Sequence, residues 1–446
     1  MQSACTTGRR VLGLVSLLLL SGISSVFSQD NSPWSRYGLG DIVPSTNIVN
    51  RGMGHTAAAY ADFQTINFVN PASYSKFGMQ RAILDVGLDI NSRTLSNNRG
   101  DSYTSSNAYI PYLGAGFQIK KEKSKTDWGL AFGLRPLTKV SYNINAGQRI
   151  PAGDSAVYNY EGNGGTYQAF VGTALGRKNF SIGINTGYRF GSKDYSTRVF
   201  LLNDTSPSRY TPGLKEVRNN FGGAFAELGL QYQLALNKKS NLQFGAYGSL
   251  QAPLRVTRNE KFESFFLAGE AGIPTRIDSV SEQRNVKGAI QYPAYYGVGL
   301  LYDFQGKGRL NVAADYVIHQ WSNYRYFDAP DFMRDSRQIK LGAQYLPDAT
   351  GTSTNFWSNV LYRAGLLLVR EPFTVDGNMN SVGFTFGAGL PVRKYSYAEV
   401  NKSNIVNLAM EFGQRSNRNS LLRENYFRLA VSFSFSDIWF IKRKYD

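Results

Sequence analysis

A regular alternation of apolar and polar side chains runs from about residue 80 to the end of the chain. In the segment 178–190, for example, Phe180, Ile182 and Ile184 are separated by small or polar residues. Successive side chains of a β-strand point to opposite faces, so this pattern gives each strand one apolar and one polar face. The chain is therefore restricted to folds in which many strands separate an apolar environment from a polar one.

About fourteen segments carry this pattern, and bacterial single-chain outer-membrane barrels have an even number of antiparallel strands. We therefore predict an all-β fold: a transmembrane antiparallel β-barrel of about 14 strands. A soluble β-sandwich is the alternative, but its strands rarely keep one face so uniformly apolar. The segments are 82–90, 113–119, 128–134, 167–175, 178–190, 224–234, 242–250, 296–302, 310–318, 339–345, 360–368, 382–390, 406–412 and 427–435.

The N-terminus has the pattern of a secretory signal peptide. Arg9 and Arg10 precede the apolar run 11–20, and small residues follow it. This run is shorter than the roughly 20 residues that a spanning helix needs. We expect the outer membrane of a Gram-negative bacterium as the location. The predicted domains are a signal peptide at 1–28, an N-terminal plug at 29–79 and the barrel at 80–446.

The net charge of +17 limits the possible partners. A basic chain can bind nucleic acid, but no basic run or recognition motif accompanies the charge here. We therefore expect anionic lipid of the outer membrane, and no nucleic acid, as the partner. The single cysteine, Cys5, lies in the predicted signal peptide, so we expect no disulfide in the mature chain. We also predict no cofactor and no metal site.

The histidines give little support for an enzyme. The chain has only two, His55 and His319, and Asp315 lies four residues before the second. Catalysis would need a base paired with a nucleophile or a carboxylate in a defined site. That single pair is too little, so we predict that the protein is not an enzyme and that His319 packs in the lumen.

A Gly- and Ala-rich stretch, RGMGHTAAAYADFQTINFVNPASYS, precedes the first predicted strand. It has no regular periodicity, yet Ile66, Phe68 and Val69 are too apolar for a solvated tail. It resembles the N-terminal hatch of the FadL family of outer-membrane channels for hydrophobic compounds. That resemblance implies a fourteen-stranded barrel with a plug in its lumen, and it extends to the branch that contains the shuttle protein of type IX secretion. The predicted plug motif is Arg51, Gly52, Gly54, Asn70, Pro71 and Ala72.

A proline interrupts the third predicted strand at Arg135-Pro136. Proline cannot donate to a ladder and is tolerated mainly at edges and bulges. The FadL resemblance implies that a kink in this strand opens a lateral gate to the lipid, so Arg135 and Pro136 are the predicted gate. The alternative is that Pro136 only ends the regular part of the strand near the outer rim.

The predicted topology places long connections outside the cell, and two of them contain aromatic clusters that could bind a ligand, bind a partner or pack the loops together. Arginine binds carboxylates with two parallel hydrogen bonds, so two inward arginines join the predicted ligand set. The outer connections are 94–106, 143–160, 191–219, 256–290, 321–337, 369–380 and 413–424. The predicted ligand-binding residues are Phe262, Phe265, Phe266, Leu267, Trp321, Tyr324, Phe327, Arg363 and Arg428.

The alternation also predicts which charged side chains face the lumen, because a charge on the lipid face is costly. With both signs present, we expect these residues mainly to hold the plug through salt bridges. They are Asp85, Asp89, Arg135, Arg189, Glu227, Asp315, Lys340, Arg363, Glu411 and Arg428.

Two functions fit these features. The first is a channel for passive uptake of hydrophobic, fatty-acid-like small molecules, captured by the outer loops and released through a plug-gated lumen or a lateral opening. The second is a non-transporting accessory or scaffold barrel in an outer-membrane secretion or barrel-assembly complex, which would bind other outer-membrane or surface proteins. An apolar tunnel would favour the channel, whereas a filled lumen with outer docking faces would favour the scaffold.

Overall fold

The computed structural model describes residues 31–78, 81–119, 125–149, 155–202, 211–268, 273–350, 352–374, 377–392, 404–417 and 422–438. The predicted signal peptide and the predicted boundary between plug and barrel at 79–80 lie outside these residues.

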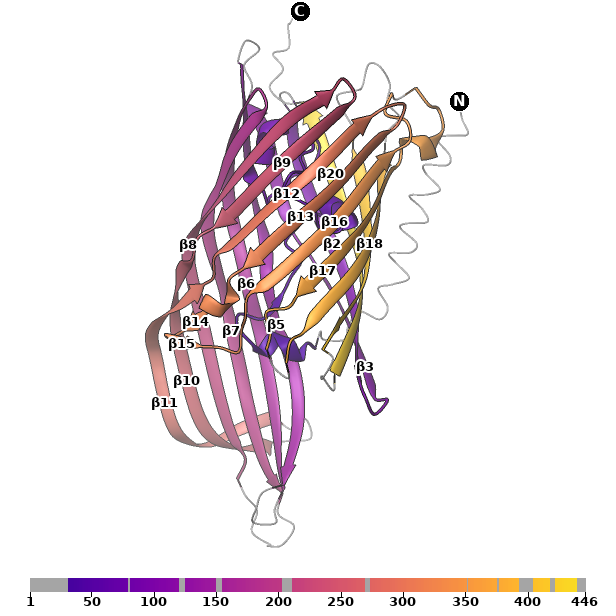
Figure 1. Cartoon of the computed structure of the whole chain (residues 1–446). Helices are drawn as coiled ribbons and strands as arrows, with labels where there is room; N and C mark the ends of the chain where they lie inside the picture. The colour runs from indigo at the N-terminus through magenta and orange to yellow at the C-terminus, as the bar shows by residue number, and fades with distance from the viewer. Residues whose placement is uncertain are drawn as a thin grey trace, which may run out of the picture.

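A closed ring of 14 antiparallel strands forms the barrel (Figure 1). The last strand pairs with the first along its whole length, from Arg81↔Ile438 to Asn97↔Leu422, which closes the ring. The predicted fold class is therefore confirmed, and each predicted segment matches one ring strand. The ring strands are β2 (Arg81–Asn97), β4 (Leu113–Ile119), β5 (Thr126–Arg149), β6 (Ser155–Arg177), β7 (Phe180–Leu202), β8 (Gly213–Asn237), β9 (Ser240–Ser249), β12 (Tyr295–Gln305), β13 (Arg309–His319), β16 (Ser336–Leu346), β17 (Leu361–Arg370), β18 (Asn380–Pro391), β19 (Ile405–Ser416) and β20 (Leu422–Ile438).

The other elements are short or lie outside the ring. The strands are β1 (Asp41–Ile42), β3 (Ser102–Tyr109), β10 (Ala252–Ala268), β11 (Ile273–Tyr292), β14 (Arg325–Tyr326) and β15 (Ala329–Pro330). The helical turns are η2 (Pro33–Arg36), α2 (Ile48–Gly52), η3 (Pro71–Lys76), η4 (Trp321–Asn323) and η5 (Phe356–Asn359). Within the described residues, no helix is long and apolar enough to cross a membrane.

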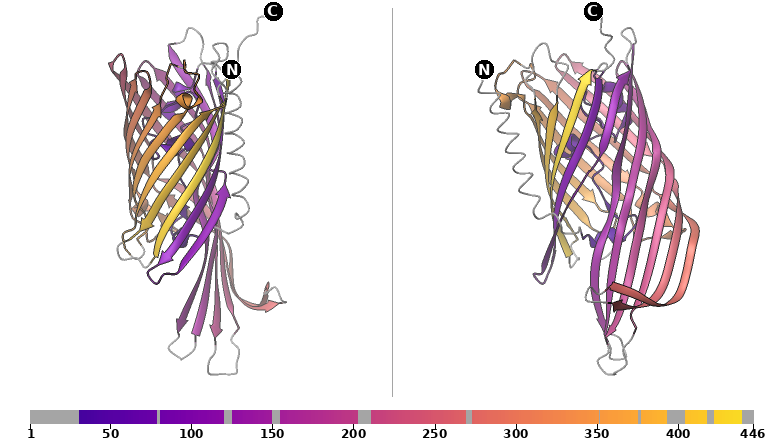
Figure 2. Two further views of the ribbon diagram at one scale, coloured as in Figure 1. Left: turned by 90° about the vertical axis from the view of Figure 1, so that its right-hand side faces the viewer. Right: turned by 180° about the vertical axis from the view of Figure 1, so that it is seen from behind.

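A sheet projects well beyond one end of the barrel, which we call the outer end (Figure 1). It consists of the outer halves of β5 to β8, continued by the hairpin β10–β11 that pairs with β8. Figure 2 shows the end of this hairpin bending away from the other strands. The prediction that 143–160, 191–219 and 256–290 are loops is therefore wrong, because most of each segment is strand.

The projecting sheet escaped prediction because neither of its faces contacts an apolar medium, so its strands need no apolar alternation. Ion pairs between neighbouring strands take the place of that pattern. Lys261 on β10 lies 2.9 Å from Glu216 on β8 and 2.9 Å from Glu263. Farther along the sheet, Arg198 lies 3.2 Å from Glu161. These pairs are partly exposed, so each contributes at most about 1 kcal/mol.

Residues 31–78, which we call the plug, run through the lumen (Figures 1 and 2). Ile66 and Phe68 of the plug are fully buried, in one apolar cluster with Phe170 and Phe225 of the wall. The wall and the plug therefore share a single core. Burial of such side chains is worth about 1.5–3 kcal/mol each, so the plug is an integral part of the fold.

Glycines on the inner face of the wall let the plug backbone approach it directly. A Cβ on Gly245 would lie 1.9 Å from the carbonyl oxygen of Ala58, and one on Gly342 would lie 2.1 Å from that of Met53. Such distances are far below a van der Waals contact. The inward small residues that alternate along the predicted strands are therefore the positions where the plug backbone packs against the wall.

Candidate functional site

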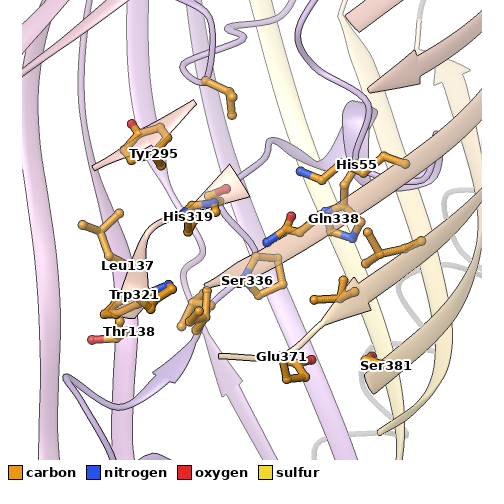
Figure 3. A pocket seen from close by; sticks show the side chains of 18 of the residues that line it. His55, Leu137, Thr138, Tyr295, His319, Trp321, Ser336, Gln338, Glu371 and Ser381 are labelled. Carbon is orange, nitrogen blue, oxygen red and sulfur yellow. The ribbon is translucent and has the colours of Figure 1, made fainter. Parts of the chain in front are cut away.

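A pocket of about 130 Å³ lies in the lumen between the plug and the inner face of the wall (Figure 3). Plug residues line one side, and side chains from β5, β13, β16 and β19 line the others. The residues labelled around it in Figure 3 are His55, Leu137, Thr138, Tyr295, His319, Trp321, Ser336, Gln338, Glu371 and Ser381.

Hydrogen-bond donors without partners gather at this pocket. Among the described residues, the buried Ser336 Oγ and Trp321 Nε1 have no hydrogen-bond partner. Lys340, which is 5% exposed, also lines the pocket. Its ammonium group interacts electrostatically with Asp315 on the neighbouring strand. A buried donor is normally satisfied, so the two donors of Ser336 and Trp321 could bond to acceptor atoms of a group in the pocket.

Asp315 lies opposite Lys340 on the neighbouring strand, and its carboxylate is hydrogen-bonded to the plug. Its Oδ2 accepts hydrogen bonds from the backbone N–H groups of Ala57 at 2.6 Å and Ala58 at 2.8 Å. The ring of His319 stacks on Tyr295 instead, with centroids 5.1 Å apart. The lumen role predicted for the histidine is thus confirmed, while Asp315 anchors the plug.

The opposite side of the pocket is apolar. Leu137 and Trp321 belong to a buried cluster with Tyr292 and Leu254, and Ile42 of the plug packs against it. The pocket is therefore amphipathic, with ammonium and hydroxyl donors on one side and aromatic rings on the other. That chemistry suits a small acceptor-bearing group attached to an apolar body.

The plug motif works through hydrogen bonds to the wall and within the plug. Arg51 forms an ion pair with Asp89 of β2. Asn70 donates to the carbonyl of Ala58 at 2.6 Å and caps the turn that begins at Pro71 by accepting from Ala72 N–H at 3.1 Å.

The two motif glycines also contact the wall. The N–H of Gly54 donates to Thr385 Oγ1 at 2.8 Å. The hydroxyl of Thr385 donates in turn to the carbonyl of Gly52 at 3.2 Å. The sequence motif thus marks the places where the plug is attached.

Residues 31–45, which we call the strap, cross the outer side of the pocket. Within the strap, β1 pairs with β5 through Asp41↔Lys139. On its other side, Asp41 accepts from Arg93 at 3.0 Å and from Arg415 at 3.1 Å. Burial raises the pKa of Asp41, but the charges of Arg415 and Arg93 outweigh it and hold the pKa well below its usual range.

Sequence reasoning missed this ion cluster, which also includes Glu371 at 3.2 Å from Arg415. Glu371 and Arg415 both fall in connections predicted as outer loops. In a loop, alternation does not indicate whether a side chain faces the lumen. The charged residues that alternation did place inward are buried in the structure, Arg428 less completely than the rest. That part of the prediction is confirmed.

Proline 136 sits at a β-bulge, and the strand does not end there. The pairing of β5 with β6 shifts between Pro136 and Thr138, which leaves Leu137 as the extra residue. Arg135 donates to the carbonyl of Ser45 in the strap at 2.9 Å and lies 3.5 Å from Glu227. The regular ladder is thus interrupted at Pro136, while the strand itself continues to Arg149. A gating role for the bulge stays a prediction.

The predicted aromatic ligand residues do not form one site. Phe262, Phe266 and Leu267 are exposed on β10 in the projecting sheet, whereas Phe265 is buried against Phe200. The other aromatic residues, Trp321, Tyr324 and Phe327, belong to or pack against the apolar cluster beside the pocket. Burial raises the pKa of the Tyr324 hydroxyl well above its usual value.

The two predicted carboxylate-binding arginines already have partners. Arg363 donates to Gln344 at 2.7 Å and to Asn407 at 3.2 Å. Arg428 pairs with Glu411 at 3.0 Å. Lys340 is therefore the better-placed cation for an anionic group in this pocket, although nothing in its sequence neighbourhood distinguishes it from the other inward charges.

Solved structures with the same architecture include a hydrocarbon channel, a toluene transporter and a FadL homologue. A FadL homologue of Pseudomonas aeruginosa is 12% identical with a TM-score of 0.55, over 90% of this chain and 100% of that one. The P. putida toluene transporter TodX is 16% identical with a TM-score of 0.54, over 89% and 99%. The monoaromatic hydrocarbon channel CymD is 15% identical with a TM-score of 0.51, over 90% and 98%. No curated protein matches.

The fold is therefore a β-barrel of the FadL type, and the predicted resemblance in fold is confirmed. The outer membrane of a Gram-negative bacterium stays the predicted location. The match of the BamG family model to residues 10–446 is more specific. The chain belongs to the BamG family.

Proposed function

We propose that this protein is an accessory or scaffold subunit of an outer-membrane secretion or barrel-assembly complex. The projecting sheet carries the proposal, because a transport lumen has no need of it. Its end exposes large apolar side chains, with Phe266 at 48%, Ile277 at 55% and Val280 at 64% exposure. Apolar groups rimmed by charged residues are typical of protein interaction sites.

The filled lumen supports the same proposal. The plug shares its core with the wall and is fixed by buried ion pairs, and the pocket of about 130 Å³ beside it is small. The lining of this pocket is amphipathic, whereas a hydrophobic channel would be expected to have an apolar tunnel.

Gentle detergent extraction of the native protein, followed by mass analysis of everything that stays bound, tests this proposal. We expect protein partners in fixed stoichiometry, and we expect Phe266→Ser with Leu267→Ser to lose them. Gln148→Ala, also exposed on the projecting sheet, is the control and keeps them. A bound lipid or acid without any protein partner would contradict the proposal.

A second function, passive passage of a hydrophobic acid, is favoured by the pocket and its position beside the bulge at Leu137. Lys340 would hold the carboxylate, the aromatic cluster would hold the apolar body, and the exposed aromatics of β10 would make the first contact. Arg135 and Pro136 would then border the exit. In the same extraction, Lys340→Met is expected to lose a bound acid while protein partners are kept. Retention of that acid by Lys340→Met would exclude the lysine as its site.

A further inference from the structure

Two arginines face each other across neighbouring strands of the barrel. Arg337 on β16 is the direct register partner of Arg370 on β17, and both side chains are exposed. Directly opposite residues of an antiparallel pair have Cβ atoms about 5 Å apart, and like charges at that distance destabilise the pair. This arrangement is therefore unfavourable unless an anion neutralises it.

Both arginines stand at the outer end of lipid-facing rows. Below Arg337 the same face of β16 carries Ile339 and Leu341, which are 46% and 44% exposed. On β17, Leu368 is the exposed residue before Arg370 on that face. The guanidinium groups therefore begin where the apolar belt ends, at the level of lipid headgroups.

The nearby carboxylates are engaged elsewhere. Glu371 follows Arg370 in the chain but is buried and pairs with Arg415. Asp335 accepts hydrogen bonds from the N–H and hydroxyl of Ser322, at 3.1 and 2.6 Å. Over the described residues, the ion pairs of this barrel include neither Arg337 nor Arg370.

A third cation adds to the positive charge. Arg334, just before β16, donates to the carbonyls of Glu371 at 2.9 Å and Met379 at 2.7 Å. Burial and the charge of Arg370 lower the pKa of Arg334. The guanidinium groups of Arg334 and Arg370 are therefore close enough to interact electrostatically. Together with Arg337 they place three positive charges beside the apolar belt.

We propose that Arg337 and Arg370 together bind a phosphate group of an outer-leaflet lipid. The planar fork of arginine matches phosphate oxygens with two parallel hydrogen bonds, which lysine cannot do. A phosphate bound between the two guanidinium groups accepts hydrogen bonds from both, and its negative charge offsets their mutual repulsion. The ligand is a lipid rather than free phosphate, because the apolar rows below the arginines lie where its acyl chains would run.

The test uses the purified full-length protein in detergent micelles, titrated with bisphosphorylated lipid A and examined by native mass spectrometry and thermal unfolding. We expect the double variant Arg337→Gln, Arg370→Gln to retain about tenfold less lipid A than the wild type. Arg284→Gln, which removes an exposed charge from the projecting sheet, is the matched control and retains it normally.

Thermal unfolding separates a binding role from a structural one. Without lipid, the double variant should unfold at or above the wild-type midpoint, because a repulsive pair has been removed. Addition of lipid A should raise the unfolding midpoint of the wild type more than that of the variant. Equal lipid retention, equal binding of dephosphorylated lipid A, full displacement by inorganic phosphate, or a lowered lipid-free midpoint would each overturn the proposal.

Discussion

Glu411 on β19 lies 3.2 Å from the Nε2 atom of His55 and so ties the barrel wall to the plug. The other ring nitrogen of this histidine lies 2.8 Å from the hydroxyl of Thr46. The backbone of His55 is left-handed, with φ 63°, a conformation that is uncommon for residues other than glycine, although asparagine, aspartate and histidine adopt it more often than the rest. A strained residue held from both sides of its ring marks a point at which the plug is fixed.

Replacing His55 should loosen the plug. His55→Ala loses both ring contacts and keeps an unfavourable backbone, so we expect a destabilisation of about 1–3 kcal/mol. His55→Asn should cost less, because asparagine tolerates the left-handed backbone. Thermal unfolding in detergent measures both effects. Equal midpoints for the two variants would show that the backbone strain is unimportant.

Asp315→Ala should leave the N–H groups of Ala57 and Ala58 buried without an acceptor. Each unsatisfied group costs about 1–3 kcal/mol, so we expect local release of the plug. Conductance of the purified protein in a planar bilayer should rise relative to the wild type. Asp315→Asn keeps one oxygen acceptor and serves as the control with a smaller rise. Unchanged conductance for Asp315→Ala would mean that other contacts suffice to hold this part of the plug.

Gly245→Ala tests whether the inner-face glycines seat the plug. The new methyl group would meet the carbonyl of Ala58 at 1.9 Å, and overpacking of this kind typically costs about 1–3 kcal/mol. Limited proteolysis should cut the plug faster than in the wild type. Gly147→Ala is the matched control, because a Cβ there meets nothing within 4 Å. Similar cleavage rates in both variants would argue against a tight seat.

Acid should weaken the strap. The pKa of Asp41 in the folded protein is depressed below its ordinary value of 3.8 by Arg415 and Arg93, against the effect of burial. Its stabilisation is therefore complete above pH 3.8 and is lost as the pH falls toward the folded value. Asp41→Asn should lower the unfolding midpoint at pH 7 and flatten its decline in acid. A variant that declines as steeply as the wild type would assign the acid sensitivity to other groups.

The barrel could be predicted from the sequence because lipid requires one apolar face on every spanning strand. The same alternation placed Asp315 and Glu411 inward, where they bind the plug. It could not show which backbone groups they would meet, because the plug has no periodicity of its own. The projecting sheet was missed for the opposite reason. Its strands have no apolar medium to face, so the segments that contain residues such as Arg198 and Lys261 lack the alternation and are predicted to be loops.

Strands β5 to β8 pass from the barrel wall into the projecting sheet without a break, and the strap is attached to the outer half of one of them. The N–H of Ser32 donates to the carbonyl of Ser141 at 2.9 Å, and that of Val43 donates to Leu137 at 3.0 Å. The strap is thus hydrogen-bonded directly to a strand that continues into the projecting sheet. Any partner that reshapes the exposed sheet would therefore act on the hydrogen bonds that hold the plug's N-terminal segment.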